Sequence, residues 1–159
     1  MNKPDLIKKI VAQLAQGLAL YYHAARAARD EATHEQNKAE NKYDTRGLEA
    51  SYLARGQSRQ AAETEKDIQQ FESLVVRPFE PEEPIGLGAL VELESKDGRS
   101  FYFVGPRAGG TEVVLDENEV LVITAQSPLG QQLLGKKQGD RFQFPTAGKG
   151  NSFRVVWVS

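Results

Sequence analysis

The residue types that commonly do chemistry are sparse in this chain, and their spacing excludes several classes of site. The two histidines, His23 and His34, lie 11 positions apart without a third ligand nearby, so we predict no histidine metal site. The chain has no cysteine, which excludes a disulfide framework and a thiolate metal site. It also shows no Ser-His-Asp set, phosphate-binding loop or dinucleotide fingerprint. The remaining candidates are charged side chains in a polar stretch near residues 37–49.

In this stretch, basic and acidic residues alternate, and Gly47 is the strong helix breaker. The charged side chains that matter below are Lys38, Glu40, Lys42, Asp44, Arg46 and Glu49. Local chemistry explains Asp44 as the N-cap of a following helix and Gly47 as a residue that permits a turn. Arg46 could contact nucleic acid or a partner, and the simpler interpretation is a solvated side chain.

Apolar residues at steps of three and four predict a helix on each side of the polar stretch. The first helix starts near Pro4, and its stripe thins from leucines and isoleucines into alanines after Tyr22. The second helix is predicted from about Leu48 to Leu74. Neither stripe is hydrophobic enough for an isolated helix, so we expect an antiparallel coiled-coil hairpin over residues 1–76.

After residue 76 the composition shifts toward Val, Phe and Gly, and the pattern indicates strands. Residues 77–86 contain three prolines and predict a short, stiff linker. Residues 87–159 predict a small α+β domain, with a hairpin turn at Asp97-Gly98. Strands are expected at 89–94, 100–104, 112–115, 120–124, 141–144 and 152–158, and a short helix at 128–134 with Ser127 as its N-cap.

The overall charge and hydropathy narrow the possible partners. The net charge is −2, from 20 basic and 22 acidic residues, which disfavours broad binding to a phosphate backbone. No run of eighteen apolar residues is present, so we expect no membrane helix and no membrane partner. The expected location is therefore the cytoplasm.

The most specific segment is Ser127-Pro128-Leu129-Gly130-Gln131-Gln132-Leu133-Leu134-Gly135-Lys136-Lys137-Gln138-Gly139-Asp140. It lies between two predicted strands, and a final hydrophobic strand follows it. This string is similar to the signature in the C-terminal domain of the Gre-family transcript-cleavage factors. The hairpin, linker and C-terminal domain occur in the same order as in that family, so the resemblance covers nearly the whole chain.

The resemblance implies a fold, a partner and a set of contact residues. It implies an FKBP-like C-terminal domain, and a coiled coil that enters the secondary channel of RNA polymerase while that domain docks at the channel rim. The implied partner-binding residues are Arg46, Ser127, Pro128, Leu129, Gly130, Lys136, Lys137, Gly139 and Asp140. Arg26 and Arg29 would be basic residues near the nascent RNA, which the protein would contact only indirectly.

The family's tip motif, D-x-x-E-N-A, is altered in this chain. In the family, two acidic tip residues help to hold a second Mg²⁺ in the polymerase active centre. One register places Asp44 at the Asp position, with Gly47 in place of the Glu and Glu49 two residues further on. The other places Glu40 at the Glu position, with Asn37 in place of the Asp. Neither register keeps both carboxylates.

From this resemblance we expect a monomeric, non-enzymatic RNA polymerase factor that stimulates cleavage of backtracked RNA. Asp44, Glu49 and Glu40 would assist in trans, and Asp44 would contact Mg²⁺ only when docked. No tightly bound cofactor is expected, because the Mg²⁺ would be shared with the polymerase. One alternative is a secondary-channel regulator that does not stimulate cleavage, which the altered tip favours slightly. The second alternative is a free FKBP-like peptide-binding or isomerase module, with an aromatic pocket drawn from Phe101, Tyr102, Phe103, Phe142, Phe144 and Trp157.

Overall fold

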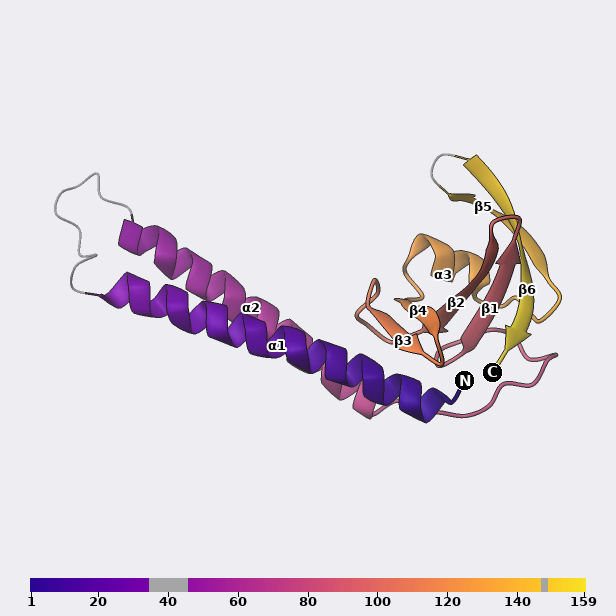
Figure 1. Cartoon of the computed structure of the whole chain (residues 1–159), viewed down its shortest axis with the longest axis horizontal. Coiled ribbons are helices and arrows are strands. Elements are labelled where there is room, and N and C mark those ends of the chain that lie inside the picture. The colour runs from indigo at the N-terminus through magenta and orange to yellow at the C-terminus, as the bar shows by residue number, and fades with distance from the viewer. Residues whose placement is uncertain (35–45, 147–148) are drawn as a thin grey trace. The chain divides into compact units, whose positions relative to one another are not determined.

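A computed structural model describes residues 1–34, 46–146 and 149–159 (Figure 1). The helices are α1 (Lys3–Thr33), α2 (Arg46–Glu72) and α3 (Pro128–Leu133). The strands are β1 (Leu90–Ser95), β2 (Gly98–Val104), β3 (Glu112–Leu115), β4 (Asn118–Ile123), β5 (Arg141–Thr146) and β6 (Lys149–Val158). This order confirms the predicted α+β architecture, in which two long helices precede a β-rich domain.

The chain packs as two compact units. One comprises Met1–Gln13 and Gln69–Ser159 and is called the sheet unit below. The other, Leu14–Ile68, is called the hairpin unit. The base of each long helix therefore belongs with the sheet, whereas the boundaries predicted at residues 76 and 86 follow the change in composition. Those domain boundaries stay a prediction.

The sheet has six strands in the order β3-β4-β2-β1-β6-β5. The pair β2–β4 is parallel, and the other neighbouring pairs are antiparallel. At the predicted hairpin turn, Ser95 pairs with Gly98, which has a φ of +123° that favours glycine. At the β3–β4 turn, Asp116 and Glu117 have positive φ values of 51° and 64°.

Both faces of the sheet are covered. Successive residues of a strand point to opposite sides, so the strands contribute side chains to a core on each face. On one face, Val91 and Ile123 belong to a core that also contains Leu133 of α3. On the other face, the ring of Phe71 from α2 lies 6.4 Å from that of Phe103, measured between centroids. Lys9 of α1 donates to the carbonyl of Val114 at 2.7 Å. The helix bases thus complete the second core.

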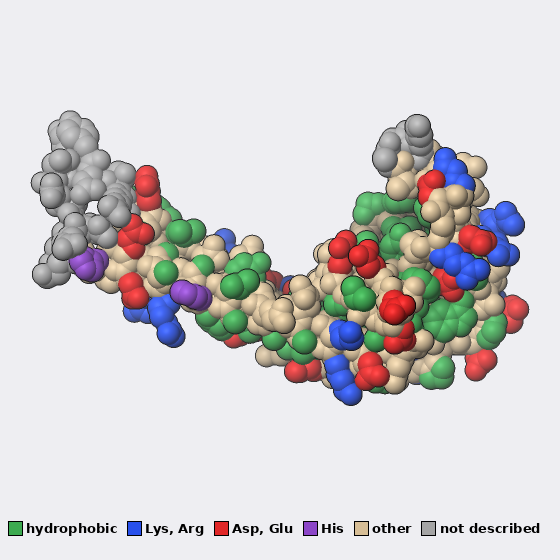
Figure 2. Space-filling view, viewed as in Figure 1, with side chains coloured by type: hydrophobic (Ala, Val, Ile, Leu, Met, Phe, Trp, Pro, Cys, Tyr) green, Lys and Arg blue, Asp and Glu red, His purple; other side chains and the backbone are tan. Residues whose placement is uncertain are grey.

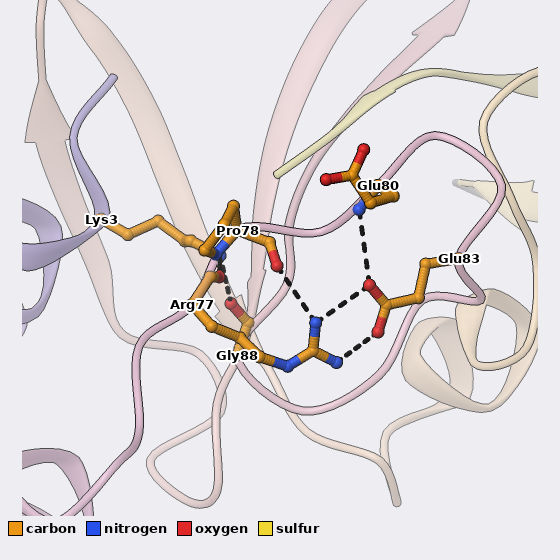
Figure 3. A network of polar contacts seen from close by, with 6 residues as sticks. All are labelled: Lys3, Arg77, Pro78, Glu80, Glu83 and Gly88. Atoms are coloured by element: carbon orange, nitrogen blue, oxygen red, sulfur yellow. Dashed lines mark hydrogen bonds and ion pairs between the residues drawn. The ribbon is translucent and has the colours of Figure 1, made fainter.

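The predicted linker, residues 77–86, packs within the sheet unit, and Figure 3 shows part of its anchorage. Phe79 and Ile85 are buried in the core. The Lys3 ammonium donates to the carbonyls of Arg77 and Gly88, and it lies 4.9 Å from the centroid of the Phe79 ring. Lys3 is only 6% exposed, so the start of α1 is fastened to this segment by a buried cation.

In the hairpin unit, α1 and α2 lie side by side, since the Tyr22 hydroxyl donates to the Glu65 carboxylate. Among the described residues of this unit, the apolar side chains that are buried are alanines, namely Ala25, Ala28, Ala50 and Ala61. Leu20 is 70% exposed and Tyr52 is 60% exposed. None of the described helices is long and apolar enough to cross a membrane.

Candidate functional site

The candidate site is built around α3, whose start is fixed by Ser127. The Ser127 hydroxyl accepts a hydrogen bond from the Gly130 amide at 3.1 Å and donates to the Thr124 carbonyl at 2.8 Å. Pro128 occupies the first turn, where a missing amide proton costs nothing. This arrangement confirms the predicted N-cap and binds the helix to the end of β4.

Gly130 is required by close packing against the backbone. A Cβ atom at this position would stand 1.9 Å from the Thr124 carbonyl oxygen, well inside van der Waals contact. The neighbouring Leu133 is fully buried, and Leu129 packs against the same core. The glycine and the two leucines of the signature therefore dock α3 on the sheet.

The end of α3 is tied to the segment that precedes β1. Gly135 has a φ of +83°, and its amide donates to the Ile85 carbonyl at 3.0 Å. In return, the Ile85 amide donates to the Lys136 carbonyl at 2.7 Å. Since Ile85 is buried, this pair of backbone bonds lets the helix terminus and the predicted linker stabilise each other.

The turn before β5 is closed by Asp140. Its carboxylate accepts from the Lys137 amide at 2.8 Å, and its own amide donates to the Lys137 carbonyl at 3.1 Å. Gly139, with a φ of +93°, donates to the Val155 carbonyl at 2.8 Å. Most of the signature thus has a structural role.

The side chains of this segment that face solvent define what we call the α3 surface. They are Pro128, Gln131, Gln132, Lys137, Gln138 and Asp140. Lys136 is half-buried, with its ammonium 5.6 Å from the centroid of the Phe142 ring. The sequence interpretation missed the three glutamines. Two of them, Gln131 and Gln132, lie between the inward-facing Gly130 and Leu133, and this spacing would have revealed them, because residues three or four apart share a helix face.

The structure describes few of the predicted tip residues. Asp44 and Glu40 lie outside the described residues, and Arg46 is the first residue of α2. Glu49 lies in the first turn of α2, where a negative charge suits the helix dipole. Within the described ranges, no group of three or more His, Asp or Glu side chains is placed to hold a metal ion.

The predicted RNA-proximal residues Arg26 and Arg29 are both exposed on α1. Their neighbours Ala25 and Ala28 are buried, so the two arginines lie on the outer side of the hairpin. They are three positions apart on one helix, which places their side chains close enough to act together.

The shifted pKa values belong to structural contacts away from the α3 surface. Burial, followed by the charge of Arg77, lowers the pKa of Lys3 to about 8. The hydrogen bond from Arg77 lowers the pKa of Glu83, and Figure 3 shows this pair. The hydrogen bond to Glu65 raises the pKa of the Tyr22 hydroxyl. Each shift follows from a contact that holds the fold.

The aromatic residues proposed for a peptide pocket are divided between the two faces of the sheet, since Tyr102, Phe142 and Phe144 pack on the core that contains Leu133, whereas Phe103 packs on the other face. Phe103 packs against Phe71, and Phe142 stacks on Phe153 with ring centroids 5.6 Å apart. Phe101 and Tyr102 instead line an open hollow of about 460 Å³. Three glutamates, at 112, 117 and 119, share its lining. This dispersion speaks against the free peptide-binding or isomerase alternative.

Known proteins resemble the chain over most of its length. Residues 80–159 match the family described as "Transcription elongation factor, GreA/GreB, C-term". The "Transcription inhibitor protein Gfh1" of Thermus thermophilus is 34% identical over 123 residues, which cover 73% of this chain and 72% of that protein. The protein of the same name from Thermus aquaticus is 33% identical over 123 residues, covering 73% of this chain and 71% of its own.

A solved structure, the crystal structure of GreA factor homolog 1 (Gfh1) of Thermus thermophilus, is 28% identical, with 94% of each chain covered and a TM-score of 0.39. The matched family segment spans half of the chain and contains the whole α3 signature. The chain therefore belongs to the GreA/GreB family of transcription elongation factors.

Proposed function

We propose that this protein binds bacterial RNA polymerase through the secondary channel and regulates transcription without stimulating cleavage of RNA. The observation that carries the proposal is the 34% identity, over 73% of the chain, to proteins named transcription inhibitors. The altered tip supports the same choice, since neither register of residues 37–49 keeps both of the family's carboxylates. The predicted stimulation of cleavage becomes the alternative outcome of the test.

The hairpin supports a channel-binding role through its dimensions. The 31 residues of α1 extend about 46 Å at 1.5 Å per residue. In the hairpin unit, alanines fill the helix contact, which allows two helices to approach closely and keeps the pair slender. Arg26 and Arg29 would then lie near the nascent RNA, as the resemblance implies.

The α3 surface is the proposed contact with the channel rim. Its backbone is fixed by the Ser127 cap, the Gly130 contact and the Asp140 turn, so its side chains are presented without a large ordering cost. Lys137 supplies a charge, and the glutamines supply donors and acceptors. In this proposal the protein acts as a monomer and holds no cofactor of its own, since any Mg²⁺ belongs to the polymerase.

The deciding experiment adds the protein to a backtracked elongation complex with end-labelled RNA and Mg²⁺. We expect no shortened RNA, together with displacement of a known channel-binding cleavage factor in a competition assay. A Lys137→Glu, Gln131→Glu double variant should lose this competition, whereas Glu72→Gln, an exposed change at the end of α2, should retain it.

Two outcomes would contradict the proposal in different ways. Short RNA products that disappear with Asp44→Ala would establish a cleavage factor that uses this carboxylate, and would overturn only the non-cleaving part. Absence of both cleavage and competition would overturn polymerase binding itself.

A further inference from the structure

We propose that a hollow on β5 and β6 of the sheet unit binds a phosphoryl group. The hollow has a volume of about 350 Å³ and is lined by Glu94, Arg141, Ser152, Phe153 and Arg154. It lies apart from α3, and nothing in the predicted family functions uses it. Figure 2 shows basic and acidic side chains gathered in the part of the molecule where β5 and β6 lie in Figure 1.

The first argument is the sheet register. It aligns one row of charged residues across β2, β1, β6 and β5, in the order Arg99, Glu94, Arg154 and Arg141. Arg141 stands directly opposite Arg154, and like charges in that position destabilise a sheet. An anion between the two guanidinium groups would remove this repulsion.

The second argument is an excess of positive charge at one end of the row. Arg99 pairs with Glu92 at 2.8 Å and reaches Glu94 at 3.9 Å. Arg154 pairs with Glu94 at 2.9 Å. Within the described part of the chain, no carboxylate pairs with Arg141. Two carboxylates thus serve three guanidinium groups, and the unmatched charge lies in the hollow.

The third argument is the type of donor that the hollow presents. Ser152 lies two residues before Arg154 on β6, so its hydroxyl is on the same face as both arginines. The backbone of β5 and β6 is paired at both arginines, which fixes where the side chains start. Planar guanidinium groups and a hydroxyl are donors suited to phosphate oxygens, and Arg binds them in a bidentate manner.

The ligand chemistry is a phosphoryl group, from a small phosphate compound or from a nucleic-acid strand. The chain as a whole has a net charge of −2, so broad attraction of polyanions does not account for binding here. The proposal does not depend on polymerase binding, and its test uses the protein alone.

The test is a titration of the isotopically labelled full chain, followed by NMR of the backbone amides at constant ionic strength. One arm uses inorganic pyrophosphate, and the other uses a single-stranded DNA oligonucleotide. We expect saturable shifts at residues 141, 152 and 154 in at least one arm. Response to pyrophosphate would indicate a small phosphate compound, and response to the oligonucleotide alone would indicate a phosphodiester backbone.

Two single variants distinguish binding in this hollow from general electrostatic attraction of an anion. Arg141→Gln should weaken binding by about tenfold, the effect of one charge-assisted hydrogen bond. Arg99→Gln removes the same charge from the same row but outside the hollow, and should leave binding unchanged. Equal weakening by both variants, or no saturable shift in either arm, would overturn the proposal.

A thermal-denaturation measurement gives an independent readout. Without phosphate, Arg141→Gln should raise the Tm or leave it unchanged, because the repulsion with Arg154 is lost. Pyrophosphate should raise the Tm of the unmodified protein more than that of the variant. An equal rise in both would count against the site.

Discussion

The two compact units of this protein bury their apolar residues in opposite ways. In the sheet unit, large side chains such as Phe103, Leu90 and Val120 have no exposed surface, and both faces of the sheet are covered. In the described part of the hairpin unit, the buried apolar residues are alanines, while larger side chains such as Leu20 and Tyr52 are exposed. The chain therefore concentrates its hydrophobic stabilisation in one unit.

Because of this difference, we expect the two units to differ in stability and in their role in function. Hydrophobic stabilisation grows with buried apolar area, at about 25 cal/mol per Å², and an alanine contributes little. Long helices without a large packed face are marginal in water. We expect the hairpin unit to open locally at a lower free energy than the sheet unit. Under the proposed function, the polymerase channel would cover the exposed apolar side chains.

The largest expected effect comes from Phe103→Ala. Phe103 is fully buried and packs on Phe71, so its truncation leaves a cavity between the sheet and the base of α2. We predict a loss of about 3–5 kcal/mol in the free energy of unfolding. Leu53→Ala in the hairpin unit, where Leu53 is 55% exposed, should cost roughly 0.5 kcal/mol or less. Denaturant unfolding would measure both, and similar losses would contradict the comparison.

The second effect tests the contact beneath α3. In Gly130→Ala, the added methyl group meets the Thr124 carbonyl oxygen, and backbone on both sides must shift. We predict a loss of about 2–3 kcal/mol, typical of overpacking a tight contact. The Tm should fall accordingly, and a Gly130→Ala protein as stable as the original would show that α3 docks differently. A loss of polymerase binding beyond the fraction unfolded would identify α3 as a contact surface.

The third effect concerns the buried Lys3 ammonium, whose pKa is lowered from 10.5 to about 8. Because the unfolded chain binds this proton more tightly, the burial cost is present below pH 8 and is relieved as the pH rises toward 10.5. Relative to Lys3→Met, the unmodified protein should therefore gain roughly 2–3 kcal/mol of stability between pH 7.5 and 10.5.

Denaturant unfolding at several pH values would measure that relative gain. Lys8→Met, which removes an exposed ammonium from the same helix, should leave the pH dependence nearly unchanged. A constant difference between the protein and Lys3→Met across this range would show that Lys3 is not buried as a cation.

Local sequence signals were enough to predict many of these elements. The Ser127-Pro128 start of α3 and the Asp97-Gly98 turn follow from capping and turn chemistry that acts within a few residues. The Asp116-Glu117 turn was not predicted, because Glu117 is not a usual choice for a positive φ, although aspartate adopts it more often than most residues. Its geometry is imposed by the pairing of β3 with β4.

The covering of the sheet by the helix bases depends on contacts far apart in the sequence. The run Val120-Leu121-Val122-Ile123 predicts a strand that is buried on both faces, since its apolar residues are consecutive. It does not predict which segment covers the second face. The buried Lys3 had no signal, because a lysine near a helix start is ordinarily solvated. Within the candidate site, the cap was predictable, and the outward-facing Gln131 and Gln132 would have followed from helical spacing. Gln138, which lies beyond α3, had no such signal.

The smallest expected effect is a stabilising one, in the hairpin unit. Gly56 lies inside α2 with open space around it, so an alanine fits and reduces the freedom of the unfolded chain. Gly56→Ala should stabilise α2 by about 0.5–1 kcal/mol, measured as slower amide hydrogen exchange across residues 48–68. Gly17→Ala in α1, also in open space, should act in the same direction. If exchange in the hairpin unit did not slow, its opening would not be limited by helix formation. The marginal stability inferred from its alanine contacts would then need another cause.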